Sequence, residues 1–230
     1  MSTKAVQENG SAKVSFSEKF NEFLAKNKIV LLSAVIVFAC VFIALVAFTV
    51  VTENRNAAAF ETVETVLEDW DTARTAEDKS GLAAKEDELL ASLQKTAAAN
   101  KTSYAGARAY MTAAEIYFSR KDWKNAQEQY LAAAKAAPRA YTVGLNWYNA
   151  AVCADELGNA DDAVAWFNKA LEAENFNLKA RALFNIGRIE EQRSKKDAAI
   201  VSYEKMAEQY PNDEWTLIAK SRIIALQIQQ

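Results

Sequence analysis

The chain has 230 residues and a formal net charge of −3, and it contains no histidine. Only 6 Gly and 2 Pro occur, which leaves little turn material for a β-sandwich or barrel and favours long helices. Residues 52–230 carry 22 Lys and Arg against 27 Asp and Glu. This mildly acidic balance argues against nucleic acid as a ligand, because phosphates need a basic face.

An uncharged run of 23 residues, Ile29–Val51, lies near the N-terminus. As a helix it would reach roughly 34 Å, enough to cross a bilayer core of about 30 Å. We therefore predict a transmembrane signal-anchor helix over residues 29–51. A cleavable signal peptide is the alternative, but its apolar core is usually only about 7–15 residues long, and no clear A-x-A site follows this run.

The residues that flank the apolar run are unequally charged. Three lysines precede it: Lys19, Lys26 and Lys28. On the far side only Arg55 is close, with Glu53 nearby. The positive-inside rule then predicts that residues 1–28 form a short basic cytoplasmic tail and that residues 52–230 lie outside the cytoplasm.

The tail also carries apolar residues at helical spacing: Phe16, Phe20, Phe23 and Leu24. Two interpretations remain open for this segment. It forms an amphipathic helix that lies on the membrane face, or it extends the spanning helix.

One pattern of residues occurs three times in the soluble part. The first copy consists of Tyr110, Ala113, Ala114, Tyr117, Ala126, Tyr130, Ala133 and Pro138. The second consists of Trp147, Ala150, Ala151, Ala154, Ala163, Phe167 and Ala170, with Asn175 in place of the proline. The third consists of Leu183, Ile186, Gly187, Glu190, Ala199, Tyr203, Met206 and Pro211. The offsets within the copies are identical and match the 34-residue tetratricopeptide repeat, which is a pair of helices.

The pattern has a physical explanation. Small residues on the first helix, such as Ala151 and Gly187, let the two helices approach closely, and a large aromatic on the second helix fills the gap to the neighbouring pair. We therefore predict an α-solenoid with three tetratricopeptide repeats over residues 104–211. The copies are 37 and then 36 residues apart, so small insertions are expected between repeats, the first at Arg139–Val143.

The flanking segments fit a longer stack. Residues 55–79 and 82–98 each show a helical apolar pattern, and together they predict a degenerate leading repeat over residues 52–103. At the other end, residues 212–230 predict a final helix that caps the apolar end of the stack. Its apolar residues are Trp215, Leu217, Ile218, Ile223, Ile224 and Leu226.

This layout resembles the membrane-anchored tetratricopeptide protein known as the ancillary subunit of the Sec translocon in bacteria. The closest local similarities are the stretch 101–110 and the ending 210–226. The resemblance implies a bacterial inner-membrane protein that faces the periplasm, near translocon subunits and a membrane-anchored chaperone or prolyl isomerase. The ending is also similar to repeat proteins of outer-membrane barrel assembly and of the Tol-Pal system.

No catalytic motif is visible: the chain has no Gly-rich phosphate loop, no HExxH and no CxxC. We therefore expect a protein that is not an enzyme and that uses no cofactor or metal. Repeat stacks bind partners along the concave face, which the first helix of each pair lines. The candidate groove residues are Arg108, Met111, Glu115, Phe118, Tyr148, Asn149, Arg181, Phe184 and Arg188, joined by Asp155 and Glu191.

Two interpretations of these residues remain open. An apolar strip with basic edges would suit an extended or helical peptide; alternatively, the aromatics pack between neighbouring helices. Some eukaryotic relatives hold a C-terminal carboxylate with a clamp of Lys and Asn, but only Asn149 matches such a position, so no clamp is expected.

The expected function is that of a protein-binding scaffold that assists secreted-protein biogenesis. The alternatives are a structural or adaptor role in envelope assembly or cell division, and a sensor whose tail signals inside the cell.

Overall fold

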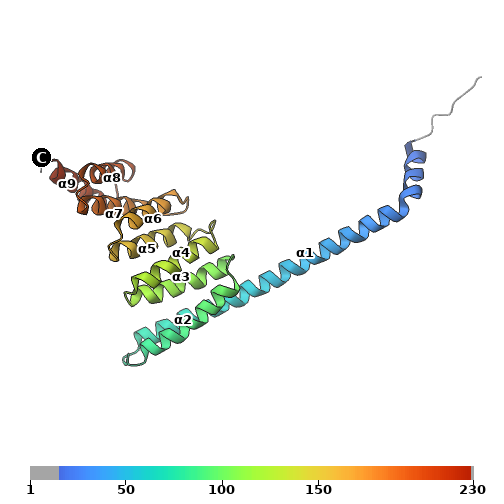
Figure 1. The fold of residues 1–230 in the computed structure, drawn as a ribbon, viewed down its shortest axis with the longest axis horizontal. Helices are drawn as coiled ribbons and strands as arrows, with labels where there is room; N and C mark the ends of the chain where they lie inside the picture. The colour runs from blue at the N-terminus through green and yellow to red at the C-terminus, as the bar shows by residue number, and fades with distance from the viewer. Residues whose placement is uncertain (1–15, 229–230) are drawn as a thin grey trace, which may run out of the picture. The chain divides into compact units, whose positions relative to one another are not determined.

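The computed structural model describes residues 16–228, and all regular structure in that range is α-helical (Figure 1). The predicted all-α class is therefore confirmed. Residues 1–15 of the predicted tail and 229–230 of the predicted capping helix lie outside the described residues. The chain divides into two compact units, Met1–Thr52 and Glu53–Gln230.

The described part of the first unit belongs to helix α1 (Phe16–Thr75). This helix is long and apolar enough to cross a membrane. Its apolar side chains are exposed, for example Phe38 at 78%. The hydroxyls of Ser33 and Thr49 each donate a 2.8 Å hydrogen bond to a carbonyl of the same helix. These hydroxyl donors therefore have partners within the helix.

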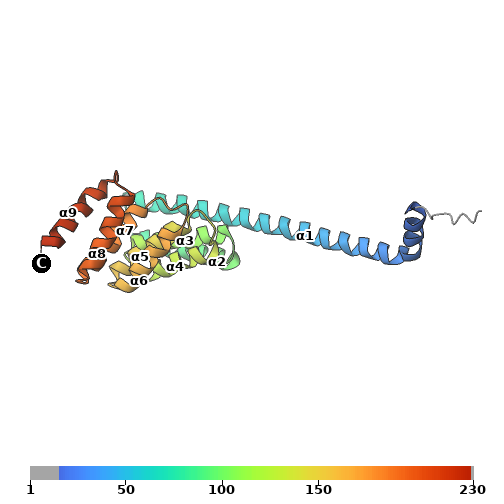
Figure 2. The same ribbon diagram turned by 90° about the horizontal axis from the view of Figure 1, so that it is seen from above.

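The second unit contains the last part of α1, from residue 53, and eight further helices within the described range (Figure 2). They are α2 (Leu82–Ala99), α3 (Tyr104–Ser119), α4 (Trp123–Ala136), α5 (Val143–Glu156), α6 (Ala160–Glu172), α7 (Lys179–Gln192), α8 (Lys196–Gln209) and α9 (Glu214–Ile228). Consecutive helices from α2 to α9 pack against one another. The three copies of the sequence pattern fall on the pairs α3/α4, α5/α6 and α7/α8.

The turn inside each of these pairs has the same backbone geometry. A single residue with positive φ links the two helices: Lys121 at 60°, Gly158 at 76° and Ser194 at 59°. Asp122 then caps α4 by accepting a hydrogen bond from the Asn125 amide at 3.3 Å. The positive-φ residues recur at the spacing of the repeat, so each pair reverses direction in the same way.

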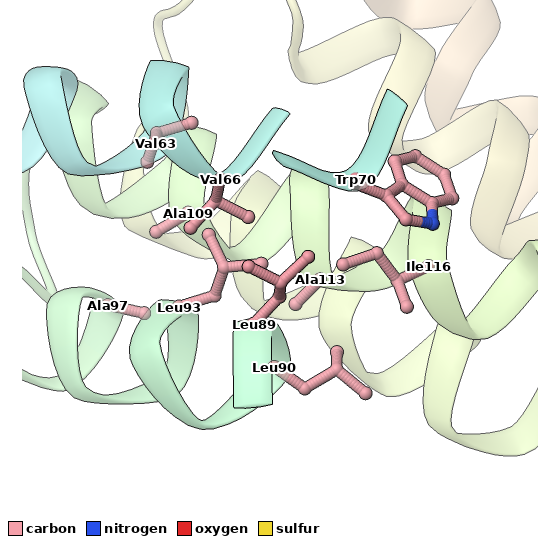
Figure 3. Packing of buried hydrophobic residues seen from close by; sticks show 10 residues of the cluster. All are labelled: Val63, Val66, Trp70, Leu89, Leu90, Leu93, Ala97, Ala109, Ala113 and Ile116. Atoms are coloured by element: carbon pink, nitrogen blue, oxygen red, sulfur yellow. The ribbon is translucent and has the colours of Figure 1, made fainter. Parts of the chain in front are cut away.

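The last part of α1 packs into the repeat stack. Val63, Val66 and Trp70 of α1 meet leucines of α2 and small residues of α3 in one buried cluster (Figure 3). The Trp70 indole also donates a 2.8 Å hydrogen bond to the buried carboxylate of Glu86, which forms an ion pair with Arg120. Residues 53–75 and α2 thus form a leading helix pair.

Each later pair contains a close contact between a small residue and an aromatic ring. In the third pair, a Cβ added to Gly187 would lie 2.5 Å from a ring carbon of Tyr203. In the second pair, Ala151 and Phe167 are completely buried in one cluster. The small residues therefore determine how near the two helices approach.

Helix α9 is the predicted final helix. Ala219 and Leu226 on one side are buried in the cluster that α7 and α8 share. On another side Leu217 and Ile224 are 73% and 58% exposed. The helix therefore covers the end of α8 but presents an apolar face of its own.

We predict that Gly187→Ala destabilises the fold. The added methyl overlaps the buried Tyr203 ring, and overpacking of this kind typically costs ~1–3 kcal/mol. For a domain of this size the melting temperature should fall by roughly 2–10 °C, measured by circular dichroism on the full chain. Gly81→Ala is the matched control, since a Cβ there meets no atom within 4 Å. Equal melting of both variants would contradict the helix contact as described.

Candidate functional site

The first helices of successive pairs share one side of the stack, which we call the first-helix face. It is formed by α1 after residue 53, α3, α5, α7 and α9. All predicted groove residues lie on three of these helices. α3 carries Arg108, Met111, Glu115 and Phe118; α5 carries Tyr148 and Asn149; α7 carries Arg181, Phe184 and Arg188.

The apolar members of the predicted groove pack mainly against neighbouring helices. Met111, Tyr148 and Phe184 are only 7–8% exposed. The Tyr148 ring lies 5.3 Å from Phe167, and the Phe184 ring 5.0 Å from Trp215, between centroids. The expected exposed apolar strip is therefore absent at these three positions, because aromatic residues of adjacent elements cover them.

Phe118 also lies against other rings. Its centroid is 4.9 Å from that of Trp123, in an edge-to-face arrangement, and 6.5 Å from that of Tyr130. Such pairs stabilise packing beyond simple area burial.

Two of the three basic members of the groove, Arg108 and Arg188, are neutralised by acids on the preceding first helix. Arg108 of α3 bonds to Glu64 of α1 at 2.7 Å, and Arg188 of α7 bonds to Asp155 of α5. Arg222 of α9 continues the series by bonding to Glu191 of α7. Ion pairs therefore join α1 to α3, α5 to α7 and α7 to α9.

Arg181 is the most exposed of the predicted arginines. Its guanidinium lies over the Trp215 ring, 5.2 Å from the centroid, and 3.9 Å from the carboxylate of Glu214. A cation in this position is held by the ring and the acid together.

The series of ion pairs is interrupted between α3 and α5. Glu115 of α3 has no ion pair or hydrogen bond with any residue of 16–228. Burial raises the pKa of the Glu115 carboxyl, and only the charge of Arg108 opposes this shift. A half-buried carboxylate without a bonded cation is costly and favours a cationic ligand.

Other polar groups gather beside Glu115. The Tyr130 hydroxyl of α4 lies within electrostatic range of Glu115, and the Asn149 side chain of α5 lies close enough to lower its pKa. Burial raises the pKa of Tyr130 well above its ordinary value, with Glu115 adding to the shift. The phenol therefore stays neutral at physiological pH and keeps its proton for hydrogen bonding.

Two residues of this region were missed in the sequence-based prediction. Leu145 is 36% exposed on α5, one turn before Asn149, and Val152 is partly buried one turn after it. Both residues could have been predicted from the repeat. The first two copies are 37 residues apart, so Leu145 is equivalent to Arg108 and Val152 is equivalent to Glu115. Apolar residues thus occupy the places where a cation would pair with Glu115.

A hollow lies at the start of α3 and before α5. It has a volume of about 700 Å³ and is lined by Thr102, Tyr104 and residues 136–141. Tyr104 donates a 2.9 Å hydrogen bond to the hydroxyl of Tyr141, and its ring also contacts Phe60 at 5.7 Å between centroids. This row of rings was not predicted; it follows from the insertion between the first two repeats.

The chemistry available on this face is that of recognition. Among residues 16–228 no group of three or more potential ligands is placed to hold a metal ion. Burial raises the pKa of the Cys153 thiol to about 12, so it remains protonated at neutral pH. The Glu115 carboxylate, the Tyr130 hydroxyl and the Asn149 amide lie where the series of ion pairs is interrupted, which we call the α3–α5 gap. These groups suit binding of a partner by hydrogen bonds and charge.

The helix pairs and this face define a helical repeat scaffold for protein–protein interaction. Family models of the tetratricopeptide repeat match residues 146–177 and 181–213. A "TPR repeat-containing protein" from Treponema pallidum (strain Nichols) is 35% identical over 193 residues, covering 78% of this chain and 80% of that protein. The chain belongs to the tetratricopeptide repeat proteins.

A solved structure shares the fold at low sequence identity. The crystal structure of MamA protein aligns with a TM-score of 0.53 and 16% identity, covering 72% of this chain and 81% of the other. YrrB, described as a TPR protein with an unusual peptide-binding site, aligns with a TM-score of 0.45 and 19% identity. The alignment covers 63% of this chain and 79% of the YrrB chain.

We predict that Glu115→Gln stabilises the protein in a pH-dependent way. Because burial raises the pKa of this carboxyl above 4.5, the folded chain holds the proton more tightly than the unfolded chain. The ionised carboxylate therefore lowers stability as pH rises through the folded pKa. Glu115→Gln should melt higher than the parent at pH 7.

Near pH 3.5 the same substitution should leave the melting temperature almost unchanged, because the carboxyl is mostly protonated in both states. Glu128→Gln is the matched control, since Glu128 is exposed on α4. A pH-independent effect of Glu115→Gln would contradict the unpaired carboxylate.

Proposed function

We propose that this protein is a membrane-anchored scaffold that binds a polypeptide partner at the α3–α5 gap of the first-helix face. The observation that carries the proposal is the half-buried Glu115, which lacks a bonded cation on a face where Arg108 and Arg188 are paired. A lysine or arginine of the partner would complete the interrupted series of ion pairs.

The surrounding residues suit an extended or helical segment. Leu145 offers an exposed apolar contact one turn from Asn149, which can hydrogen-bond to a peptide group. A partner cation would form a charge-assisted hydrogen bond with Glu115, and such bonds contribute about 1.5–3 kcal/mol. No catalytic step is part of this proposal; tetratricopeptide proteins are generally non-catalytic scaffolds.

The compartment is the second part of the proposal. The uncharged run 29–51 serves as an uncleaved anchor in a bacterial inner membrane, and the lysines before it keep the N-terminus in the cytoplasm. Residues 52–230 then face the periplasm. The support is the length of the run and the exposed apolar surface of α1.

The partners that we favour are subunits of the Sec translocon and a membrane-anchored chaperone or prolyl isomerase. The support is the resemblance in layout, from the basic tail to the repeats. A structural role in envelope assembly or cell division remains the second candidate, supported by the similarity of residues 210–226 to other envelope repeat proteins.

Cross-linking from the gap tests the binding site. A photo-reactive residue placed at Leu145 in the full chain should capture a partner in cells, to be identified by mass spectrometry. Translocon or chaperone subunits would support the favoured role, whereas Tol-Pal or barrel-assembly subunits would support the second one.

In the same experiment, Glu115→Gln should lower the cross-linked yield about tenfold or more, since a charged hydrogen bond is lost. The control Glu128→Gln should not change it. If the yield were insensitive to Glu115→Gln, the gap would not be the binding site.

A fusion experiment tests the compartment. Alkaline phosphatase joined after Gln230 should be active in a bacterial host, because the enzyme needs the oxidising periplasm. An intact but inactive fusion would place the repeats in the cytoplasm and refute the orientation that the flanking lysines predict.

A further inference from the structure

Helix α9 occupies the place of the first helix of another repeat. Ile186 and Ile189 of α7 pack against the preceding pair, and Ile223 and Leu226, 37 residues later, do the same in α9. Leu183 and Gly187 therefore correspond to Lys220 and Ile224. In the third pair, Leu183 and Gly187 face the second helix, α8. The corresponding side of α9 should face a second helix too.

No described residue covers that side of α9. Leu217 is 73% exposed, Ile224 58% and Ile228 76%. Together with Ser221 they follow each other at intervals of four, three and four residues, which places them in one stripe along the helix. We call this stripe the α9 outer face.

A second side of α9 is apolar as well. Ala219 and Leu226 are buried against α7 and α8. A helix with two apolar sides normally packs on both of them. A repeat stack that ends in solvent instead needs a polar outer surface, and the α9 outer face lacks one.

We propose that the α9 outer face pairs with the same face of a second copy of this chain. The two helices of a repeat run antiparallel, and a two-fold axis across α9 also makes the two α9 helices antiparallel. With the axis between Ser221 and Ile224, Leu217 of one copy meets Ile228 of the other. Ser221 of one copy then lies opposite Ile224 of the other, so that a large side chain packs against a small one.

Charge favours a second copy over an ordinary second helix of a repeat. Lys220 borders the outer face, at the place that Leu183 occupies in the third repeat. A tightly packed second helix would bury this ammonium group, which is costly. In the two-fold pair, Lys220 lies near the neutral Gln227 of the other copy and stays at the rim.

The other cation of the helix is already paired. Arg222 bonds to Glu191 of α7, on the first-helix face. The two-fold pair therefore brings no like charges together.

Cross-linking of the full chain in bacterial membranes tests this pairing. The background is Cys40→Ser, and Cys153 remains because it is buried. Ser221→Cys should give a dimer with a bismaleimide that spans ~10 Å, about the separation of two packed helices. The control Glu128→Cys, on the exposed side of α4, should give little dimer.

A charge-swap series tests direct self-contact. In the Ser221→Cys background, Ile224→Lys and Ile224→Glu should each lower the dimer yield about tenfold or more, because a charge replaces a buried apolar contact. Coexpression of the two variants should restore the yield, since opposite charges then meet. Unchanged circular dichroism spectra of the purified variants would show that the repeats stay folded.

Three results would overturn the proposal. One is a Ser221→Cys dimer yield no higher than that of the Glu128→Cys control. Another is a yield that Ile224→Lys does not change. The third is cross-linking of Ser221→Cys to a different protein in place of a second copy, which would assign the α9 outer face to a foreign helix. None of these results bears on the Glu115 site, which lies on α3.

Discussion

The contact between a small residue on one helix and a large ring on its partner is the constraint on which the rest of this structure depends. At Gly187 there is no room even for a methyl group against Tyr203. Because interiors are packed to crystal-like density, such a contact fixes the separation of the two helices to within a fraction of an ångström. The contact thereby determines which residues of the first helix face its partner helix. It also determines which residues of that helix remain on the first-helix face.

The charged residues of the first-helix face follow from this arrangement. Arg108, Arg188 and Arg222 reach acids on the preceding first helix, since those helices lie side by side. Half-exposed ion pairs contribute only about 0–1 kcal/mol each. Their main effect is to leave most of the face electrically balanced, which makes the unpaired Glu115 the place where a partner's charge has the largest effect.

The sequence predicted the helix pairs well because the repeat pattern describes contacts within a pair. Gly187 and Tyr203 are recognisable from spacing alone. The exposure of the groove aromatics could not be predicted in the same way. Tyr148 is covered partly by Phe176, 5.7 Å away between ring centroids, in the segment between α6 and α7. That segment lies outside the pattern, so nothing in the spacing predicts where its side chains lie.

Helix α9 was read as a cap because its apolar residues were considered together. Helical spacing separates them into two faces, and only the face with Ala219 and Leu226 is buried. Ile224, on the other face, stands where Gly187 meets its partner ring in the third pair, and it is 58% exposed.

The two proposed surfaces lie on different helices and do not compete. Glu115 is on α3, whereas the α9 outer face is two repeats further along the chain. A pair formed through α9 would carry two copies of the Glu115 site, and a partner with two cationic segments would gain affinity from the second contact. One helix–helix contact is small beside the roughly 1,000 Å² of a stable interface. With both copies anchored in one membrane, as proposed above, their effective concentration would rise, so that even this modest contact would hold the pair together.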